Sequence, residues 1–311
     1  MKRLFVILTI GLLYTPISLF SQACCSGGVP FLGALEVSTI PAKNLQLSLT
    51  YDYNRLSRVY SGTDYLEVDP NQRRRIGQAV LLRGSYGFSS RIATTVVVSV
   101  IQQQRRITAG GTGNTDFIKA QGIGDAAALI KYSFIPFNMM SQRELSLSAG
   151  VKIPLGANDL TSDGIRVSED LQPGSGAWDA IIGGYIAKGF MPTVPITAFF
   201  RSSFRVTGTN SIGYKFGNEF VASIGANYAP KSIINYSLLF RYRSVTADKR
   251  NNAVLPNSGG NWLYVIPGLN FNLTPSMGVR FSGQFPIYRN LDGTQLTTTY
   301  RLSASFFYVL F

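Results

Sequence analysis

The sequence predicts an all-β protein, a transmembrane antiparallel up-and-down β-barrel of about twelve strands, on the strength of three observations. The chain begins with an export signal, and no later apolar run approaches the roughly 20 residues that a membrane-spanning helix needs. Polar and apolar residues alternate in one segment after another, as they do where strands face lipid outside and a polar lumen inside. The last segment, residues 297–311, keeps this alternation and ends in aromatic residues.

Residues 1–23 have the features of a secretory signal peptide. Lys2 and Arg3 precede an apolar run over residues 4–13, and Ser21 and Ala23 occupy the −3 and −1 positions of a cleavage site. An exported membrane protein without spanning helices has one remaining way to satisfy its backbone in lipid, which is a closed barrel. The expected location is therefore the bacterial outer membrane.

The composition fits a wall that faces lipid. Only 14% of the 311 residues are charged, whereas a soluble domain typically has about 25%. The net charge of +13 favours anionic partners, and for an exported barrel the nearest are lipid head groups rather than nucleic acid. We expect a monomer whose partners are outer-membrane lipids and lipopolysaccharide, the outer-membrane assembly machinery and a small-molecule solute.

Residues 24–43 form a separate N-terminal segment, interrupted by Pro30 and Pro41. It is expected either to plug the barrel mouth or to remain in the periplasm. The adjacent Cys24 and Cys25 leave three interpretations open: lipidation of Cys24, a disulfide between the two, or two free thiols. Two cysteines in a chain without histidine do not make an ordinary zinc site, so we expect no metal and no cofactor.

Residues 44–311 carry the barrel. Five short connections alternate with six longer polar ones, which predicts an even number of strands with all long loops at one end. Short connections are expected at residues 89–91, 135–142, 191–195, 229–233 and 273–276, and long ones at 55–75, 105–121, 155–174, 207–215, 246–261 and 288–296. In two segments, residues 178–188 and 262–272, polar and apolar residues do not alternate regularly, which indicates either bulges or a half-apolar lumen.

Charged residues on the polar strand faces are expected to point into the lumen, because a Lys or Arg facing lipid costs about 2–4 kcal/mol near the bilayer midplane. The candidates for the solute path are Arg83, Asp125, Lys131, Asp179, Arg201, Arg205, Glu219, Arg241, Arg243 and Arg280. The arginines at 201, 205, 241 and 243 would either form a basic ladder beside the path or pair with acids and brace the wall.

The C-terminus carries an expected assembly signal. Phe307, Val309 and Phe311 follow one another at two-residue steps, which resembles the C-terminal signal of bacterial outer-membrane proteins. In that class the last strand pairs with the first and closes the barrel.

Two segments carry a family resemblance. Gly122, Gly124 and Asp125 begin one strand, and a later strand is entered through Pro173, Gly174, Gly176 and Asp179. This pair of motifs resembles the outer-membrane family known as putative meta-pathway phenol-degradation proteins. The resemblance implies a barrel related to fatty-acid and toluene transporters, with passive uptake of hydrophobic or aromatic compounds. From the residues alone, the two acids are either salt-bridge partners in the wall or contacts for a solute.

Two function classes follow. The first is a passive pore or transporter for hydrophobic or aromatic compounds or for small anions; the alternative is a structural or adhesion-type barrel with a closed lumen. An enzyme is not expected, because a chain with no histidine has no Ser-His-Asp arrangement. Arg73, Arg74 and Arg75 would bind lipopolysaccharide phosphates or form a solvated basic loop.

Overall fold

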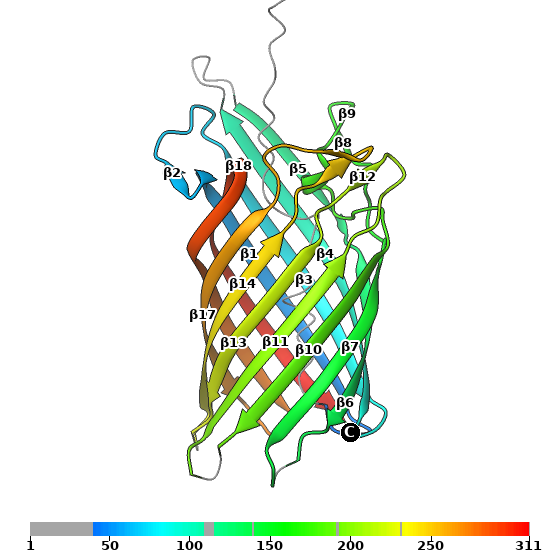
Figure 1. Cartoon of the computed structure of the whole chain (residues 1–311), viewed down its shortest axis with the longest axis vertical. Coiled ribbons are helices and arrows are strands. Elements are labelled where there is room, and N and C mark those ends of the chain that lie inside the picture. The colour runs from blue at the N-terminus through cyan, green and yellow to red at the C-terminus, as the bar shows by residue number, and fades with distance from the viewer. Residues whose placement is uncertain (1–39, 109–114, 139, 191–192, 231, 311) are drawn as a thin grey trace, which may run out of the picture.

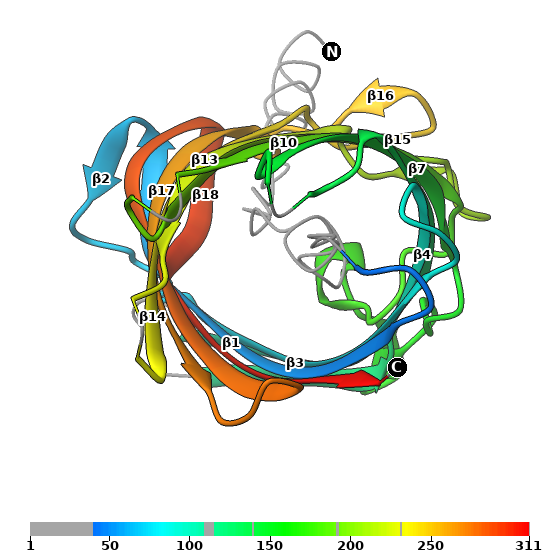
Figure 2. The same cartoon turned by 90° about the horizontal axis from the view of Figure 1, so that it is seen from below.

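The computed structural model describes residues 40–108, 115–138, 140–190, 193–230 and 232–310, and these form a closed antiparallel barrel (Figure 1). The strand order around the wall is β18-β17-β14-β13-β11-β10-β7-β6-β4-β3-β1, and β18 pairs with β1 to close the ring, which Figure 2 shows along the barrel axis. The expected signal peptide, Cys24, Cys25, the segment up to residue 39 and Phe311 lie outside the described residues.

The wall strands are β1 (Leu45–Gly62), β3 (Arg74–Gly87), β4 (Ile92–Thr108), β5 (Thr115–Ile123), β6 (Ala126–Ile135), β7 (Arg143–Ile153), β10 (Asp179–Gly189), β11 (Ile196–Val206), β13 (Glu219–Tyr228), β14 (Ile234–Val245), β17 (Gly260–Asn272) and β18 (Met277–Leu310). The loops hold β2 (Asp64–Leu66), β8 (Thr161–Ser162), β9 (Ile165–Arg166), the 3₁₀ turn η1 (Glu169–Leu171), β12 (Tyr214–Lys215), β15 (Lys249–Arg250) and β16 (Ala253–Val254).

Strand β18 crosses the wall twice. Its first part, up to Leu291, pairs with β17, and its second part pairs with β1 from Leu310 back to Thr294. Gly293, at a φ of 79°, lies between the two parts, where only glycine turns the chain without strain. Strands β5 and β6 both pair with β4 and together make a single crossing. The described wall therefore has twelve crossings, which agrees with the predicted number.

The outward faces of the strands are apolar and exposed. Leu49, Val100 and Ile224 keep 51%, 56% and 60% of their surface, a degree of exposure that suits a lipid-facing wall. In the described part of the chain, no helix has the length and apolarity to cross a membrane. The alternation read from the sequence thus assigns the faces correctly.

Connection lengths also separate the two ends of the barrel. The five short turns lie together at the end marked C in Figure 1, and the long loops lie at the other. Three predicted loops, residues 55–75, 105–121 and 288–296, are wrong in extent because much of each is strand. Above the bilayer a strand no longer needs an apolar outer face, so its pairing continues after the hydropathy alternation has ended.

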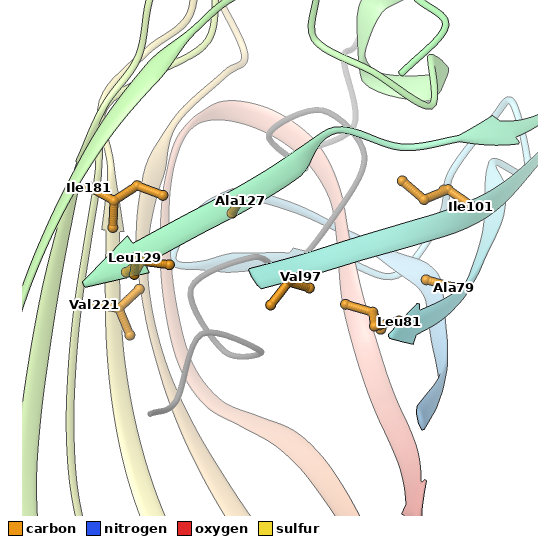
Figure 3. Close-up of a cluster of buried hydrophobic side chains, with 8 residues drawn as sticks. All are labelled: Ala79, Leu81, Val97, Ile101, Ala127, Leu129, Ile181 and Val221. Carbon is orange, nitrogen blue, oxygen red and sulfur yellow. The ribbon is translucent and has the colours of Figure 1, made fainter. Parts of the chain in front are cut away.

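Part of the barrel interior is apolar. Ala79, Leu81, Val97, Ile101, Ala127, Leu129, Ile181 and Val221 form a buried cluster, the apolar band (Figure 3). A second inner cluster includes Trp262, Tyr264 and Ile266 of β17. These clusters explain why residues 178–188 and 262–272 alternate poorly: the inward positions of β10 and β17 are apolar as well as the outward ones.

Candidate solute path and ion-pair belt

A cavity of about 400 Å³ lies inside the barrel, lined by residues from strands all round the wall. Six of the described lining residues are cationic and one is acidic. These charged residues are Arg83, Lys131, Arg201, Arg241, Arg280, Arg301 and Asp52. The rest of the lining includes serine hydroxyls, amide and aromatic side chains and five members of the apolar band.

Neutral neighbours hold several of these arginines in place. The Nε of Arg83 donates to Ser48 Oγ at 3.1 Å, and Arg241 donates to Gln284 Oε1 at 2.9 Å. The guanidinium of Arg201 lies 5.3 Å from the ring centroid of Phe199, in cation–π geometry. These contacts orient the three guanidinium groups within the cavity lining.

Two ion pairs brace the wall at the level of the cavity. Arg301 donates to both carboxylate oxygens of Asp52 at 2.8 Å, and Ser303 adds a hydrogen bond of 2.6 Å to the same acid. Lys131 pairs with Glu144 at 2.8 Å. The first pair joins β1 to β18 across the closure of the barrel, and the second joins β6 to β7.

A separate chain of alternating charges runs around the barrel toward its long-loop end; we call it the ion-pair belt. It consists of Asp125, Lys152, Asp179, Arg205, Glu219 and Arg243. The successive N···O distances are 2.8, 3.1, 3.6, 2.8 and 2.6 Å. Its last cation, Arg243, lies 4.9 Å from the ring centroid of Trp262.

The belt holds its charges away from water. Its side chains are between 2% and 16% exposed. Burying so many ions is tolerated only where each has a close counter-ion and further hydrogen bonds. Three acids alternate with three cations along the belt, so it is neutral as a unit and braces β7, β10, β11, β13 and β14 together.

The two glycine-containing motifs meet at one end of the belt. The carboxylate of Asp125 accepts hydrogen bonds from Gly156 N at 3.1 Å, Ser175 N at 3.0 Å and Ser175 Oγ at 2.7 Å. Gly174 packs directly on the backbone of Gly156, where a Cβ atom would collide. Gly176, at a φ of 69°, makes the turn that follows. The motifs therefore build a junction that fastens the β7–β10 loop to the barrel.

The β7–β10 loop, residues 154–178, folds inward, and Figure 2 shows its green trace inside the ring of strands. Asp170 forms an ion pair with Arg75 at 2.8 Å, and Ser168 accepts a hydrogen bond of 3.1 Å from Arg105. Leu171 and Gln172 have no exposed surface. The loop thus narrows the mouth of the barrel at the long-loop end.

The ten predicted path residues fall into two groups. Those that line the cavity are Arg83, Lys131, Arg201, Arg241 and Arg280. Those that form the belt are Asp125, Asp179, Arg205, Glu219 and Arg243. The expected basic ladder is therefore divided: Arg201 and Arg241 face the cavity, while Arg205 and Arg243 share Glu219.

The predicted path residues do not include Lys152 and Ser175, which hold the inward loop together with Arg75. Arg75, expected at the outer rim or in a solvated loop, is instead buried against Asp170. For Ser175 a signal existed, because it lies inside the Pro-Gly-x-Gly motif. Phe307 and Val309 of the expected assembly signal lie on β18 opposite Ser48 and Gln46 of β1, at the closure of the barrel.

At the rim, outside the membrane-spanning part, the buried Tyr214 contacts the half-buried Asp248. Tyr214 donates to Asp248 at 2.6 Å, and Gly217 N donates to the same carboxylate at 2.8 Å. Burial raises the pKa of Asp248, outweighing the hydrogen bonds from Tyr214 and Gly217 that act to lower it. Burial and the neighbouring Asp248 raise the pKa of Tyr214. This contact links the loop after β11 to the loop after β14.

Comparison with known proteins identifies the fold. No family model and no curated protein matches the sequence. Among solved structures, an outer membrane channel from Pseudomonas putida F1 is similar with a TM-score of 0.64 and 11% identity, over 88% of this chain and 98% of that one.

Two further structures have lower similarity. The β domain of the Bordetella autotransporter BrkA has a TM-score of 0.48 and 11% identity, over 86% of this chain and 100% of that one. A Pseudomonas aeruginosa FadL homologue has a TM-score of 0.45 and 10% identity, over 86% and 90%. The fold is that of bacterial outer-membrane β-barrels, a class in which short turns face the periplasm and long loops face outward.

Proposed function

We propose that this protein is a passive outer-membrane channel for small solutes that combine an apolar body with a negative charge, such as aromatic carboxylates. The observation that carries the proposal is the cavity lining, where cations outnumber acids: the described lining residues together with Glu144, the partner of Lys131, include six cations and two acids. A water-filled path lined by one sign of charge concentrates counter-ions and repels ions of the same sign. The P. putida structure of similar fold is described as an outer membrane channel, which supports the same class.

The apolar band supports the second half of the proposed solute. Leu81, Val97 and Leu129 belong both to this band and to the cavity lining. The family resemblance in the sequence implies hydrophobic or aromatic compounds, whereas the lumen charges favour anions. A solute with a ring and a carboxylate satisfies both, because the ring contacts the band while arginines such as Arg83 and Arg201 hold the carboxylate.

The direct test compares solutes with the same body and different charge. Purified protein in planar bilayers would be placed in gradients of sodium benzoate and of benzylammonium chloride, with sodium acetate as the anion without a ring. We expect single-channel steps and a higher permeability for benzoate than for benzylammonium. Benzoate is larger than acetate and would diffuse more slowly through an inert pore, so a benzoate permeability above that expected from its size would indicate contact between the ring and the apolar band. Preference for benzylammonium would contradict the proposal.

One observation favours the alternative of a structural barrel with a closed lumen. The inward β7–β10 loop is fastened at Asp125 and at Asp170 and narrows the mouth. If correctly folded protein gives no conductance steps with any of these salts, the closed barrel is the better description. The folded state is checked in the same sample by its altered electrophoretic mobility before and after heating.

The partners expected from the sequence follow from the location. The C-terminal crossing of β18, with Phe307 and Val309, is the segment we propose that the assembly machinery recognises, because it must pair with β1 to close the wall. Each barrel closes on itself through its own β1 and β18, which supports a monomeric unit.

A further inference from the structure

The run of three arginines at residues 73–75 divides in the folded protein. Arg73 pairs with Asp69 at 3.0 Å within its own loop, and there the pKa of Asp69 falls because the hydrogen bonds and charge of Arg73 outweigh the opposing effect of burial. Arg75 points into the barrel and pairs with Asp170. Arg74, between them, is exposed on the outer face of β3. One guanidinium of the three is therefore available to the surroundings of the barrel.

Arg74 does not stand alone on that face. Its Cα partner on β4 is Arg106, which is also exposed. On the outer face one step closer to the membrane, Arg55 of β1 and Lys119 of β5 lie in a common row with Ile76 and Gln104. We call Arg55, Arg74, Arg106 and Lys119 the basic patch. It extends over four adjacent strands of the wall.

The position of the patch relative to the bilayer can be read from the strand register. Val80, Val100 and Ile123 form an outward row of cross-strand partners and are 41%, 56% and 63% exposed, which places them in the lipid-facing belt. The next row toward the long-loop end consists of Gln78, Gln102 and Gln121. The order of the rows is thus apolar, amide and then cationic.

This order matches the boundary between acyl chains and phosphorylated head groups. Gln102 and Arg106 are four residues apart on β4, which is about 13 Å along the strand and, at a strand tilt of about 40°, about 10 Å along the bilayer normal. Arg55 and Lys119 lie about half as far above the glutamine row, so the basic patch begins in the polar layer just above the acyl chains. Phe117, the Cα partner of Arg106, keeps 56% of its surface and offers an apolar contact beside the charges.

The direct opposition of Arg74 and Arg106 points to an anionic occupant. Like charges at directly opposed positions on neighbouring strands destabilise a sheet. An anion held between the two guanidinium groups would reverse that effect, and phosphate matches guanidinium geometry in a bidentate manner. We propose that the basic patch binds the phosphate groups of a phosphorylated glycolipid in the outer leaflet, with the acyl chains lying along the apolar rows below.

The test uses the full-length protein in detergent and the diphosphorylated lipid A moiety as the probe, with binding measured by native mass spectrometry. The variant Arg74→Gln/Arg106→Gln/Lys119→Gln extends the glutamine rows already present on this face. A matched control, Lys215→Gln/Lys249→Gln/Arg250→Gln, removes as many cations from the rim strands β12 and β15. Folding of each variant is checked by heat-dependent electrophoretic mobility.

We expect the wild type and the control variant to bind the diphosphorylated lipid at least about tenfold more tightly than its dephosphorylated form, because the bonds to phosphate are charge-assisted. The patch variant should bind both forms equally. Equal binding of the phosphorylated lipid by wild type and patch variant would overturn the proposal, as would an equal loss in the control variant. Inorganic phosphate serves as a second probe. Binding of inorganic phosphate by the patch as tightly as the diphosphorylated lipid would overturn the assignment to a glycolipid and show that free phosphate is the ligand.

Discussion

The ion-pair belt and the cavity are built from the same residue types but handle charge in opposite ways. In the belt, every cation lies between or beside acids at N···O distances of 2.6–3.6 Å. Among the six described cations of the cavity lining, Arg301 and Lys131 pair with acids, whereas Arg83 and Arg241 donate hydrogen bonds to the neutral side chains of Ser48 and Gln284. The neutral belt joins the strands of the wall, whereas we expect the excess of cations in the cavity lining to favour the entry of anions. The comparison shows that an arginine in a barrel must be judged by its neighbours.

The largest expected effect comes from removing the central cation of the belt. Lys152→Met leaves Asp125 and Asp179 facing each other without their shared partner, in a site where the side chains are 2–3% exposed. Breaking a buried pair in this way costs about 3–5 kcal/mol. The free energy of unfolding would be measured by urea titration in lipid vesicles. The exposed Lys249→Met is the control and should change it by less than about 0.5 kcal/mol. Similar losses for the two variants would mean that the belt does not brace the wall.

A smaller loss is expected from disturbing the junction between the belt and the inward loop. Gly174→Ala places a methyl group against the backbone of Gly156, which costs about 1–3 kcal/mol as overpacking. The β7–β10 loop should then open, so limited proteolysis should cut it faster than in the wild type. Gly84→Ala is the matched control, because the added Cβ would meet only Leu47 at 3.6 Å. Unchanged protection of the loop in Gly174→Ala would contradict the role of the junction.

Removing cations from the cavity lining should change the ion selectivity of the channel rather than the stability of the barrel. Arg83→Gln/Arg201→Gln removes two lining cations that are not members of the belt, so the free energy of unfolding should stay within about 1 kcal/mol of wild type. The ratio of cation to anion permeability, obtained from the reversal potential in a salt gradient, should rise several-fold. An unchanged reversal potential in the folded variant would show that these arginines brace the barrel as the belt does.

The smallest effect concerns pH at the rim. The pKa of Asp248 lies above its ordinary value of 3.8 because of burial, so the folded protein retains this proton at a pH where the unfolded chain has lost it. The associated stabilisation is present in acid and is lost as the pH rises from about 4 through the raised pKa. Asp248→Asn should remove this decline, which hydrogen exchange of the loops after β11 and β14 would detect. A decline that persists in the variant would assign it to another group.

The fold was predictable because lipid imposes one rule on every crossing. An outward polar residue is costly in the membrane, so the faces of β1, β3 and β4 follow directly from alternation. The same rule ends at the membrane surface. Several strands continue beyond the membrane surface, as β1 does over residues 55–62. Polar and apolar residues do not alternate there, so the extension of the strands could not be inferred from the sequence.

The division of the charges could not be predicted for a different reason. Arg201 and Arg205 lie on the same face of β11 with the same local pattern. Register alone separates them, because Arg205 is opposite Glu219 whereas Arg201 is opposite Ser223. A shift of two residues between β11 and β13 would leave each side chain on the same face of its strand but would move Arg205 away from Glu219. Sequence alternation determines the faces but does not determine the register.

The pairing of β1 with the second crossing of β18 has a consequence for the order of folding. The Asp52–Arg301 pair joins residues that are 249 positions apart in the chain. Contacts between such distant positions bring a large loop-closure entropy and slow folding. Until the C-terminal crossing has been synthesised and delivered, β1 remains an unpaired edge that can recruit other strands. The ring therefore closes only when both ends of the chain are present, and a chain without its C-terminal crossing leaves one edge of β1 open to other strands.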